Sequence, residues 1–326
     1  MLGYQGSVFN GGSYSSRLFI FPEARVLIRR KDMSIFKGAG VAIVTPMKEN
    51  LDVNYDKLEE LINFHVDNGT DAIIIAGTTG ESSTLTMEEH RQVIRAAVEF
   101  TKHRIPVVAG TGSNCTRTAI QLTKEAEEDG ADAALIVTPY YNKATQAGLV
   151  SHYSQIADET KLPIILYNVP GRTGCNLQPE TVATLVKTKE NIVGLKEATG
   201  NMAQASETMR QCDGKLELYS GEDGLVVPLL SIGGIGVISV ISNVAPRQTH
   251  DMLQAFFDGD VEKAAAMQLR SLPLVNALFS EVNPIPVKKA LNLMGMNVGS
   301  LRSPLCEMGA EHAAQLEQAM KDFGIL

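Results

Sequence analysis

A lysine stands inside an apolar segment that has the composition of a buried strand. Residues 192–199 read IVGLKEAT, which places Lys196 among side chains that avoid water. Desolvation disfavours an ammonium group and lowers the pKa of a lysine. A neutral amine can attack a carbonyl carbon to form a Schiff base. Lys196 could equally be a structural lysine, either paired with a core carboxylate or extended to the rim, and the segment leaves both interpretations open.

Three tyrosines end other apolar segments. Tyr167 closes the run ILYNVP, and Tyr140 and Tyr141 stand together in VTPYYN. A phenol near an imine can move protons during the reaction. A packed aromatic ring whose hydroxyl caps a loop is the commoner role. Both interpretations stay open for all three residues.

Two loop segments could bind an anion. Residues 77–82 read GTTGES, and the glycines allow exposed backbone N–H groups to approach a carboxylate or a phosphate. The segment lacks the lysine of a P-loop, which argues against a nucleotide. Arg172, in NVPGRTG, could grip a carboxylate through two hydrogen bonds. The alternatives are a capped tight turn and a solvated loop arginine.

We expect neither a metal nor a cofactor. Glu222 and Asp223 could ligate a metal through oxygen, but Glu197 is the only further acidic residue at a neighbouring strand end. The six histidines form no HxH or HExxH pattern, and the four cysteines form no CxxC pair. This cysteine usage favours a reduced, intracellular and cytoplasmic chain.

Eight apolar segments alternate with helical patterns and must position these residues. They are residues 40–47, 72–77, 106–112, 133–141, 163–170, 192–199, 216–223 and 236–243. Most are continuously apolar, which is typical of parallel strands buried on both faces. Eight such units predict an α/β fold, a (β/α)8 TIM barrel. A doubly wound sheet is the rival fold, but the first turn carries no GxGxxG.

The chain divides into three predicted parts. Residues 1–33 hold five basic and two acidic residues, and we interpret them as a leader or a non-native start that is poorly ordered. An organelle transit peptide is the alternative. Residues 34–258 form the barrel. Residues 259–326 contain no strand signal and predict a C-terminal helical appendage with helices near residues 261–282, 285–293 and 311–323.

Composition excludes several classes of protein. The 326 residues carry a formal charge of −8 and are 44% hydrophobic, which are ordinary values for a globular chain. An acidic balance argues against nucleic acid as the partner. No apolar run reaches the roughly 18 residues that a membrane helix needs, so we expect no membrane association.

The candidate residues converge on one end of the predicted barrel. Barrel enzymes carry their chemistry where strands end and βα loops begin. Lys196, Tyr167, the 77–82 turn and Arg172 all lie at or just after strand ends. Together they suit imine chemistry on a small carbonyl compound that carries a carboxylate.

The sequence from about Ser34 to Leu326 resembles the dihydrodipicolinate synthase family of pyruvate-dependent class I aldolases and lyases. The resemblance rests on the segments GVAIVTPM, AGTTGESSTL, VVAGTGSN, VTPYYNKATQ, ILYNVPGRTG, GLKEATGN, GVISVISN and NPIPVKKAL. It implies a Schiff-base lyase that condenses pyruvate with L-aspartate 4-semialdehyde to give 4-hydroxy-tetrahydrodipicolinate, on the route to diaminopimelate and lysine. It implies no cofactor, because the lysine imine is the electron sink.

The resemblance implies a catalytic role for four residues. Lys196 would form the imine with pyruvate, which then becomes an enamine. Tyr167 would shuttle protons in that step, and Thr78 and Tyr141 would complete the relay. The tyrosine that matches Tyr140 reaches towards a neighbouring subunit in this family, which implies a tight dimer, usually within a homotetramer.

The resemblance also implies how substrates are held. Thr79 and backbone N–H groups of its turn would bind the pyruvate carboxylate. Arg172 would bind the carboxylate of L-aspartate 4-semialdehyde. Gly221 and Ile238 would contribute backbone and packing around Lys196.

Lysine-sensitive members of the family bind lysine at a subunit interface through six positions. The matching residues here are Ser83, Met87, His90, Asn114, Thr118 and Tyr140. Met87 stands where such members often have histidine, and Thr118 where they have glutamate. Because Thr118 cannot pair with an ammonium group as a carboxylate does, we predict weak or absent inhibition by lysine.

The sequence leaves two rival functions open. N-acetylneuraminate lyase or a 2-keto-3-deoxy sugar acid aldolase would share Lys196 and Tyr167, but Thr79 and Arg172 favour the synthase. A non-catalytic sensor of oxo acids would bind pyruvate without turnover. The intact set of Lys196, Tyr167, Thr78 and Tyr141 argues against a sensor.

Overall fold

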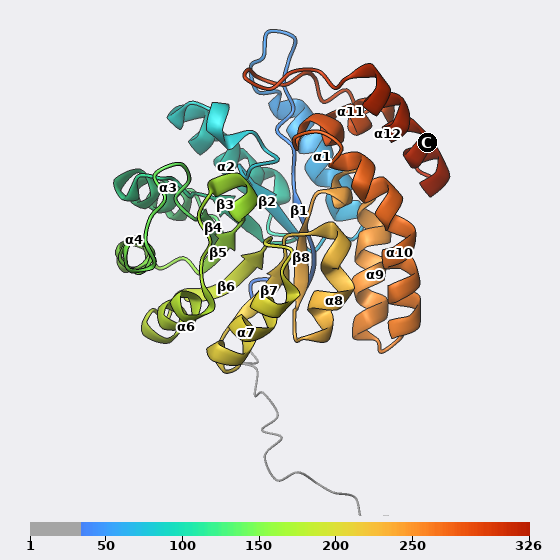
Figure 1. Cartoon of the computed structure of the whole chain (residues 1–326). Coiled ribbons are helices and arrows are strands. Elements are labelled where there is room, and N and C mark those ends of the chain that lie inside the picture. Colours follow the sequence, from blue (N-terminus) through green and yellow to red (C-terminus); the bar gives the residue numbers. More distant parts are fainter. Residues whose placement is uncertain (1–33) are drawn as a thin grey trace, which may run out of the picture.

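Eight parallel strands close into a barrel in the computed structural model, which describes residues 34–326 (Figure 1). The strands pair in chain order, and β1 pairs with β8 to close the ring. Their bounds are β1 Gly38–Ala42, β2 Ala72–Ile75, β3 Val107–Gly110, β4 Ala133–Val137, β5 Ile164–Asn168, β6 Ile192–Glu197, β7 Glu217–Ser220 and β8 Gly236–Ser239. The predicted (β/α)8 barrel is confirmed, and the prediction for residues 1–33 lies outside the described residues.

The strands are shorter than the apolar segments that predicted them. The first segment continues to residue 47 and the fourth to residue 141, whereas β1 ends at Ala42 and β4 at Val137. Each of these segments contains a proline, Pro46 or Pro139, which has no N–H to donate to a strand ladder. The remaining apolar residues therefore form the loops at the carboxyl end of the barrel.

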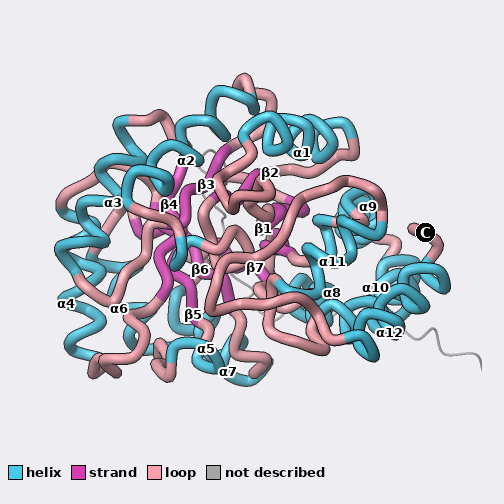
Figure 2. Tube along the Cα trace, turned by 90° about the horizontal axis from the view of Figure 1, so that it is seen from above, coloured by secondary structure: helices cyan, strands magenta, loops and turns pink. Residues whose placement is uncertain are grey.

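Helices surround the strands on all sides, as the view along the barrel shows (Figure 2). They are α1 Tyr55–Asp67, α2 Met87–Thr101, α3 Thr116–Glu128, α4 Gln146–Asp158, α5 Pro170–Thr173, α6 Pro179–Thr188, α7 Met202–Cys212, α8 Val226–Ser231 and α9 Pro246–Phe257. Local sequence starts several of them. Asn54 caps α1, and Thr86 with Glu89 forms a capping box on α2.

Three further helices follow the barrel. They are α10 Val261–Leu278, α11 Ile285–Leu293 and α12 Ala310–Phe323. Helix α10 packs against α9 and α12, and α11 lies near the loop that follows β1 (Figure 1). The predicted C-terminal helical region is confirmed. We propose residues 259–326 as its extent, because α9 ends at Phe257 and α10 begins at Val261.

An aromatic pair closes the amino-terminal end of the barrel interior. Phe36 stacks on Tyr219 with ring centroids 4.5 Å apart, and the Tyr219 hydroxyl donates to the Phe36 carbonyl at 2.9 Å. Both rings are buried, and burying a large apolar side chain contributes about 2 kcal/mol or more. A ligand must therefore enter from the carboxyl end.

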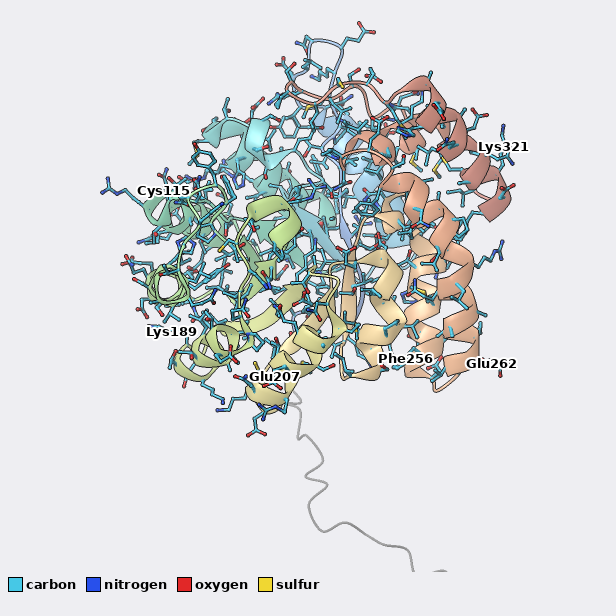
Figure 3. The ribbon with its side chains drawn as sticks, in the orientation of Figure 1. Cys115, Lys189, Glu207, Phe256, Glu262 and Lys321 are labelled. Atoms are coloured by element: carbon cyan, nitrogen blue, oxygen red, sulfur yellow. The ribbon has the colours of Figure 1, made fainter. Side chains whose placement is uncertain are left out.

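Charged side chains on the outside of the barrel form ion pairs. Lys189 pairs with Asp158 and Lys321 with Glu317, each at 2.6 Å, and Figure 3 shows the two lysines on opposite sides of the molecule. Such exposed pairs add little stability. Among residues 34–326, no helix is long and apolar enough to cross a membrane.

Candidate active site

A pocket opens at the carboxyl ends of the strands and contains six of the predicted site residues. It is lined by side chains or backbone of Thr78, Thr79, Tyr167, Arg172, Lys196 and Gly221. These residues come from the loops or ends of β2, β5, β6 and β7. The strand order brings them together although they span about half of the described chain.

Lys196 is buried in this pocket without a carboxylate partner. Its side chain is 6% exposed, and within residues 34–326 it makes no ion pair. The other buried lysine, Lys288, pairs with Glu81 at 2.8 Å. Desolvation lowers the pKa of Lys196 to about 8, although the charges of Asp223 and Glu222 oppose the shift. The geometry therefore favours a reactive amine over the structural alternative.

Tyr167 lies directly beside Lys196. The two residues are register partners on β5 and β6, so their side chains lie on the same face of the barrel. Lys196 Nζ is 4.3 Å from the centroid of the Tyr167 ring. Burial raises the pKa of Tyr167 to about 12, while the charge of Arg172 and a hydrogen bond with Thr78 act in the opposite direction. Tyr167 is thus a neutral phenol at pH 7, linked to Thr78.

The turn after β2 lines the pocket and is held by contacts with the segment that follows β1. Ala76 and Glu81 both have positive φ, 52° and 55°. Gly80 packs against the segment that follows β1, because a Cβ atom there would meet the Ile43 carbonyl oxygen at 3.2 Å. Thr45 Oγ1 donates to the Gly80 carbonyl at 2.7 Å. The turn is therefore fixed, as an anion-binding turn requires.

Arg172 lies at the opposite wall, in the short helix α5 that follows β5. Its guanidinium is exposed, and Nη2 donates to the Asn283 carbonyl at 3.3 Å. Its other guanidinium N–H groups make no hydrogen bond within residues 34–326 and can bind a carboxylate of a ligand.

Gly221 and Ile238 pack around the lysine in different ways. A Cβ atom on Gly221 would lie 3.1 Å from Lys196 Cε and 2.7 Å from Ala198 Cβ, so the site requires glycine. Ile238 is buried on β8 and belongs to the interior cluster that contains Tyr167. It does not line the pocket itself.

Tyr141 does not join the other site residues within one chain. Its side chain is 90% exposed, and its neighbour Tyr140 is 40% exposed. Tyr141 is not among the residues that line the pocket. A relay that includes Tyr141 is therefore not assembled by a single copy of the chain.

Of the residues predicted for the regulatory site, Asn114 and Tyr140 are in contact. Asn114 Nδ2 donates to the Tyr140 carbonyl at 3.1 Å. Ser83 is exposed in the short helix Ser82–Thr84, and His90 is buried in α2 with Nε2 2.8 Å from the Gly110 carbonyl. Burial lowers the pKa of His90. A neutral histidine offers no charge to a ligand at pH 7.

Two pocket residues were missed because they lie outside the strands. Phe279 and Asn283, between α10 and α11, line the pocket. Asn283 Nδ2 donates to Thr79 Oγ1 at 2.9 Å. Asn283 belongs to NPIPVKKAL, which marked the family resemblance, but its place in the helical region gave no sign of contact with the site.

Asp223, near Lys196, accepts hydrogen bonds from the loop that follows β8. Asp223 Oδ2 accepts hydrogen bonds from the N–H groups of Val240 and Ile241, each at 2.9 Å. Among the described residues, no three His, Cys, Asp or Glu side chains are grouped so that they could hold a metal ion.

The fold and the pocket define a class: (β/α)8-barrel proteins with a desolvated, unpaired lysine at the carboxyl end of a strand, the arrangement of Schiff-base-forming enzymes. Comparison with known proteins gives the family. A sequence model described as the dihydrodipicolinate synthetase family matches residues 35–323. The chain belongs to this family, which confirms the resemblance seen in the sequence.

Relatives support the assignment along nearly the whole chain. The chain is 63% identical over 294 residues to 4-hydroxy-tetrahydrodipicolinate synthase of Lachnoclostridium phytofermentans, covering 90% of this chain and 100% of the relative. The pyruvate complex of dihydrodipicolinate synthase from Acinetobacter baumannii is 45% identical, with a TM-score of 0.87 and coverage of 89% and 99%. The enzyme from Cyanidioschyzon merolae with lysine bound is 43% identical, with a TM-score of 0.88 and coverage of 90% and 100%.

Proposed function

We propose that this protein is a lyase that condenses pyruvate with L-aspartate 4-semialdehyde to give 4-hydroxy-tetrahydrodipicolinate, in lysine and diaminopimelate biosynthesis. The observation that carries the proposal is the buried Lys196, which contacts the Tyr167 ring and has no ion pair in the described part of the chain. The names of the relatives, 4-hydroxy-tetrahydrodipicolinate synthase, support the product. They also favour the synthase over the sugar acid lyases and over a sensor.

The first half of the reaction forms an enamine. The neutral Lys196 amine attacks C2 of pyruvate, and the carbinolamine loses water to give a protonated imine. The imine withdraws electrons, so a proton leaves C3 and the enamine forms. Tyr167, with a pKa of about 12, is not a phenolate at pH 7. We assign it a relay role, in which its hydroxyl accepts one proton and passes on another through Thr78.

The second half forms the new carbon–carbon bond. The enamine C3 attacks the aldehyde carbon of L-aspartate 4-semialdehyde, whose carboxylate Arg172 binds. The substrate's own amine then attacks C2 and displaces the Lys196 nitrogen, which closes the ring and frees the enzyme. Thr79 and the N–H groups of its turn hold the carboxylate of pyruvate throughout. Such fixed orientation can lower the barrier by several kcal/mol.

We propose that a second copy of the chain completes the relay. Tyr141 is almost fully exposed in one chain, and Tyr140 beside it presents a further exposed ring. Large aromatic side chains in contiguous exposed positions are typical of interfaces. The family resemblance supports tight dimers within a homotetramer, and a biosynthetic role supports a cytoplasmic location.

Trapping of the imine tests the proposed function. The protein is incubated with pyruvate, reduced with borohydride and digested, and the modified peptide is identified by mass spectrometry. We expect an adduct on Lys196, and turnover when L-aspartate 4-semialdehyde is added. No adduct on the folded protein would remove the mechanism, and an adduct on another lysine would remove the assignment of Lys196.

Inhibition by lysine is predicted to be weak or absent. Met87 and Thr118 replace the histidine and glutamate of lysine-sensitive members, so the ligand's ammonium lacks a carboxylate partner at these positions. The measurement is the initial rate at increasing lysine concentration. Strong inhibition by lysine below about 1 mM would contradict the prediction. A dissociation constant of about 1 mM corresponds to a binding free energy of roughly −4 kcal/mol.

A further inference from the structure

One residue of the segment between α10 and α11, Asn283, forms hydrogen bonds with two residues that line the pocket. Asn283 is 5% exposed. Its Nδ2 donates to Thr79 Oγ1 at 2.9 Å, and its backbone carbonyl accepts from Arg172 Nη2 at 3.3 Å. Asn283 thus contacts the two side chains to which the proposed function assigns the two substrate carboxylates.

The direction of the first of these hydrogen bonds decides what Thr79 can do. A threonine hydroxyl has one proton and two lone pairs, whereas an amide NH₂ group only donates. By donating to Oγ1, Asn283 occupies a lone pair and leaves the Thr79 proton to point elsewhere. Among residues 34–326, no acceptor takes that proton. Thr79 is 3% exposed and lines the pocket, so the proton is free for a ligand's carboxylate.

A buried ion pair five residues further along the chain ties the same turn to α11. Lys288 Nζ bonds Glu81 Oε1 at 2.8 Å and also donates to the carbonyls of Thr45 and Ser300. The 79–81 turn is therefore tied twice to the C-terminal region, once through Asn283 and once through Lys288. The amide is thus presented to Thr79 in a fixed position.

We propose that Asn283 is a positioning residue that sets the Thr79 hydroxyl as a hydrogen-bond donor to the carboxylate of the bound oxo acid. Its carbonyl holds Arg172 next to this subsite, so one residue aligns the binding of both substrates. The inference rests on the proposed function, since it concerns how that pocket binds pyruvate.

A double-mutant cycle on Thr79 and Asn283 tests the inference. The readout is the pyruvate concentration that gives half-maximal borohydride trapping on Lys196, which needs no second substrate. The variants are Asn283→Ala, Thr79→Val and the double variant, with Thr79→Ser as the control that keeps the hydroxyl. Asn283→Ala and Thr79→Val are each expected to raise this concentration about tenfold, because a hydrogen bond to the charged carboxylate is lost.

The two effects must not add. If Asn283 acts through Thr79, the double variant behaves like Thr79→Val within about twofold. A product of the two effects, about 100-fold, would overturn the proposal, and so would an unchanged response of Asn283→Ala. Wild-type protein that forms no adduct would instead defeat the proposed function, so the two failures are distinguishable.

An isosteric substitution tests the direction of the hydrogen bond even if Asn283→Ala fails to fold. In Asn283→Asp both side-chain oxygens only accept, so the Thr79 proton turns towards the carboxylate. We expect pyruvate binding to weaken more than about tenfold, and by less when Thr79→Val is already present. Retention of wild-type binding by Asn283→Asp would overturn the proposal.

Discussion

Among residues 34–326, two buried lysines have opposite environments. Lys288 has a carboxylate and two carbonyls around its ammonium, whereas Lys196 has an aromatic ring and no ion pair within residues 34–326. Desolvation is the largest cause of the lowered pKa of both residues. The difference in partners makes one lysine a structural cation and the other a candidate nucleophile.

Imine formation should therefore depend on pH through Lys196. With a pKa of about 8, the neutral fraction of this amine falls about tenfold for each pH unit below 8. We expect the initial trapping rate at low pyruvate to rise about tenfold per unit from pH 5.5 to 7.5 and to level off above pH 8. The measurement is borohydride trapping across this range. A rate that keeps rising to pH 10, as an unperturbed lysine requires, would contradict the assignment.

Burial of Lys196 should also lower the free energy of unfolding of the protein. Its pKa is lowered from 10.5 to about 8 on folding, which corresponds to about 3 kcal/mol. Since the unfolded chain binds this proton more tightly, the cost is complete below pH 8 and disappears as the pH rises through 10.5. Lys196→Met is expected to raise the free energy of unfolding at pH 7 by up to about 3 kcal/mol. Urea unfolding measures this free energy. An unchanged or lower free energy of unfolding at pH 7 would refute the prediction.

At the scale of elements, the turn after β2 and helix α11 form one unit. Glu81 has a positive φ. One of its carboxylate oxygens accepts a hydrogen bond from Lys288 Nζ of α11, and the other accepts from the backbone N–H of Arg302 at 3.0 Å. Both side chains of the ion pair are at most 1% exposed. The helical region is therefore part of the structure that shapes the active site.

Removal of one member of this pair should be strongly destabilising. Lys288→Met leaves the Glu81 carboxylate buried without its cation, which costs about 3–5 kcal/mol. The matched control is Lys196→Met, the same substitution at the lysine without an ion pair, for which the opposite sign is expected. Urea unfolding of both variants gives the comparison. In the double variant Lys288→Met with Glu81→Gln, part of the loss should return.

The sequence predicts the strands well and the pocket only in part. A charged residue inside an apolar run stands out, so Lys196 and its strand were recognisable. The ends of β1 and β4 lie earlier than predicted, at Ala42 and Val137, because the apolar residues that follow resemble strand as much as loop. Asn283 was not recognisable, because it lies 204 residues from Thr79 along the chain and asparagine is common in loops.

At the scale of the whole molecule, one chain holds an incomplete set of the predicted catalytic residues. Lys196, Tyr167 and Thr78 share the pocket, whereas Tyr141 lies outside it with 90% of its side chain exposed. The strand pattern alone could not indicate this, because Tyr141 and Tyr167 both lie near the carboxyl end of a predicted strand. A site shared between copies reconciles the predicted relay with this geometry.

Complementation between inactive subunits distinguishes a shared site from a self-contained one. Lys196→Met removes the nucleophile and Tyr141→Phe removes one relay hydroxyl. We expect each variant alone to lose at least about 100-fold in kcat. In a mixed dimer, the Tyr141→Phe chain keeps its own Lys196 and receives Tyr141 from the Lys196→Met chain, so one of its two sites is intact.

Random mixing of the two variants in equal amounts makes about half of the dimers mixed, so about a quarter of wild-type activity should return. The variants are co-expressed with different affinity tags, mixed dimers are isolated by two purification steps, and initial rates are compared with each parent. The purified mixed dimer should then show about half of the wild-type rate per chain. If Tyr141 served the pocket of its own chain, every site in the mixture would lack one group and the mixed dimer would be no more active than its parents.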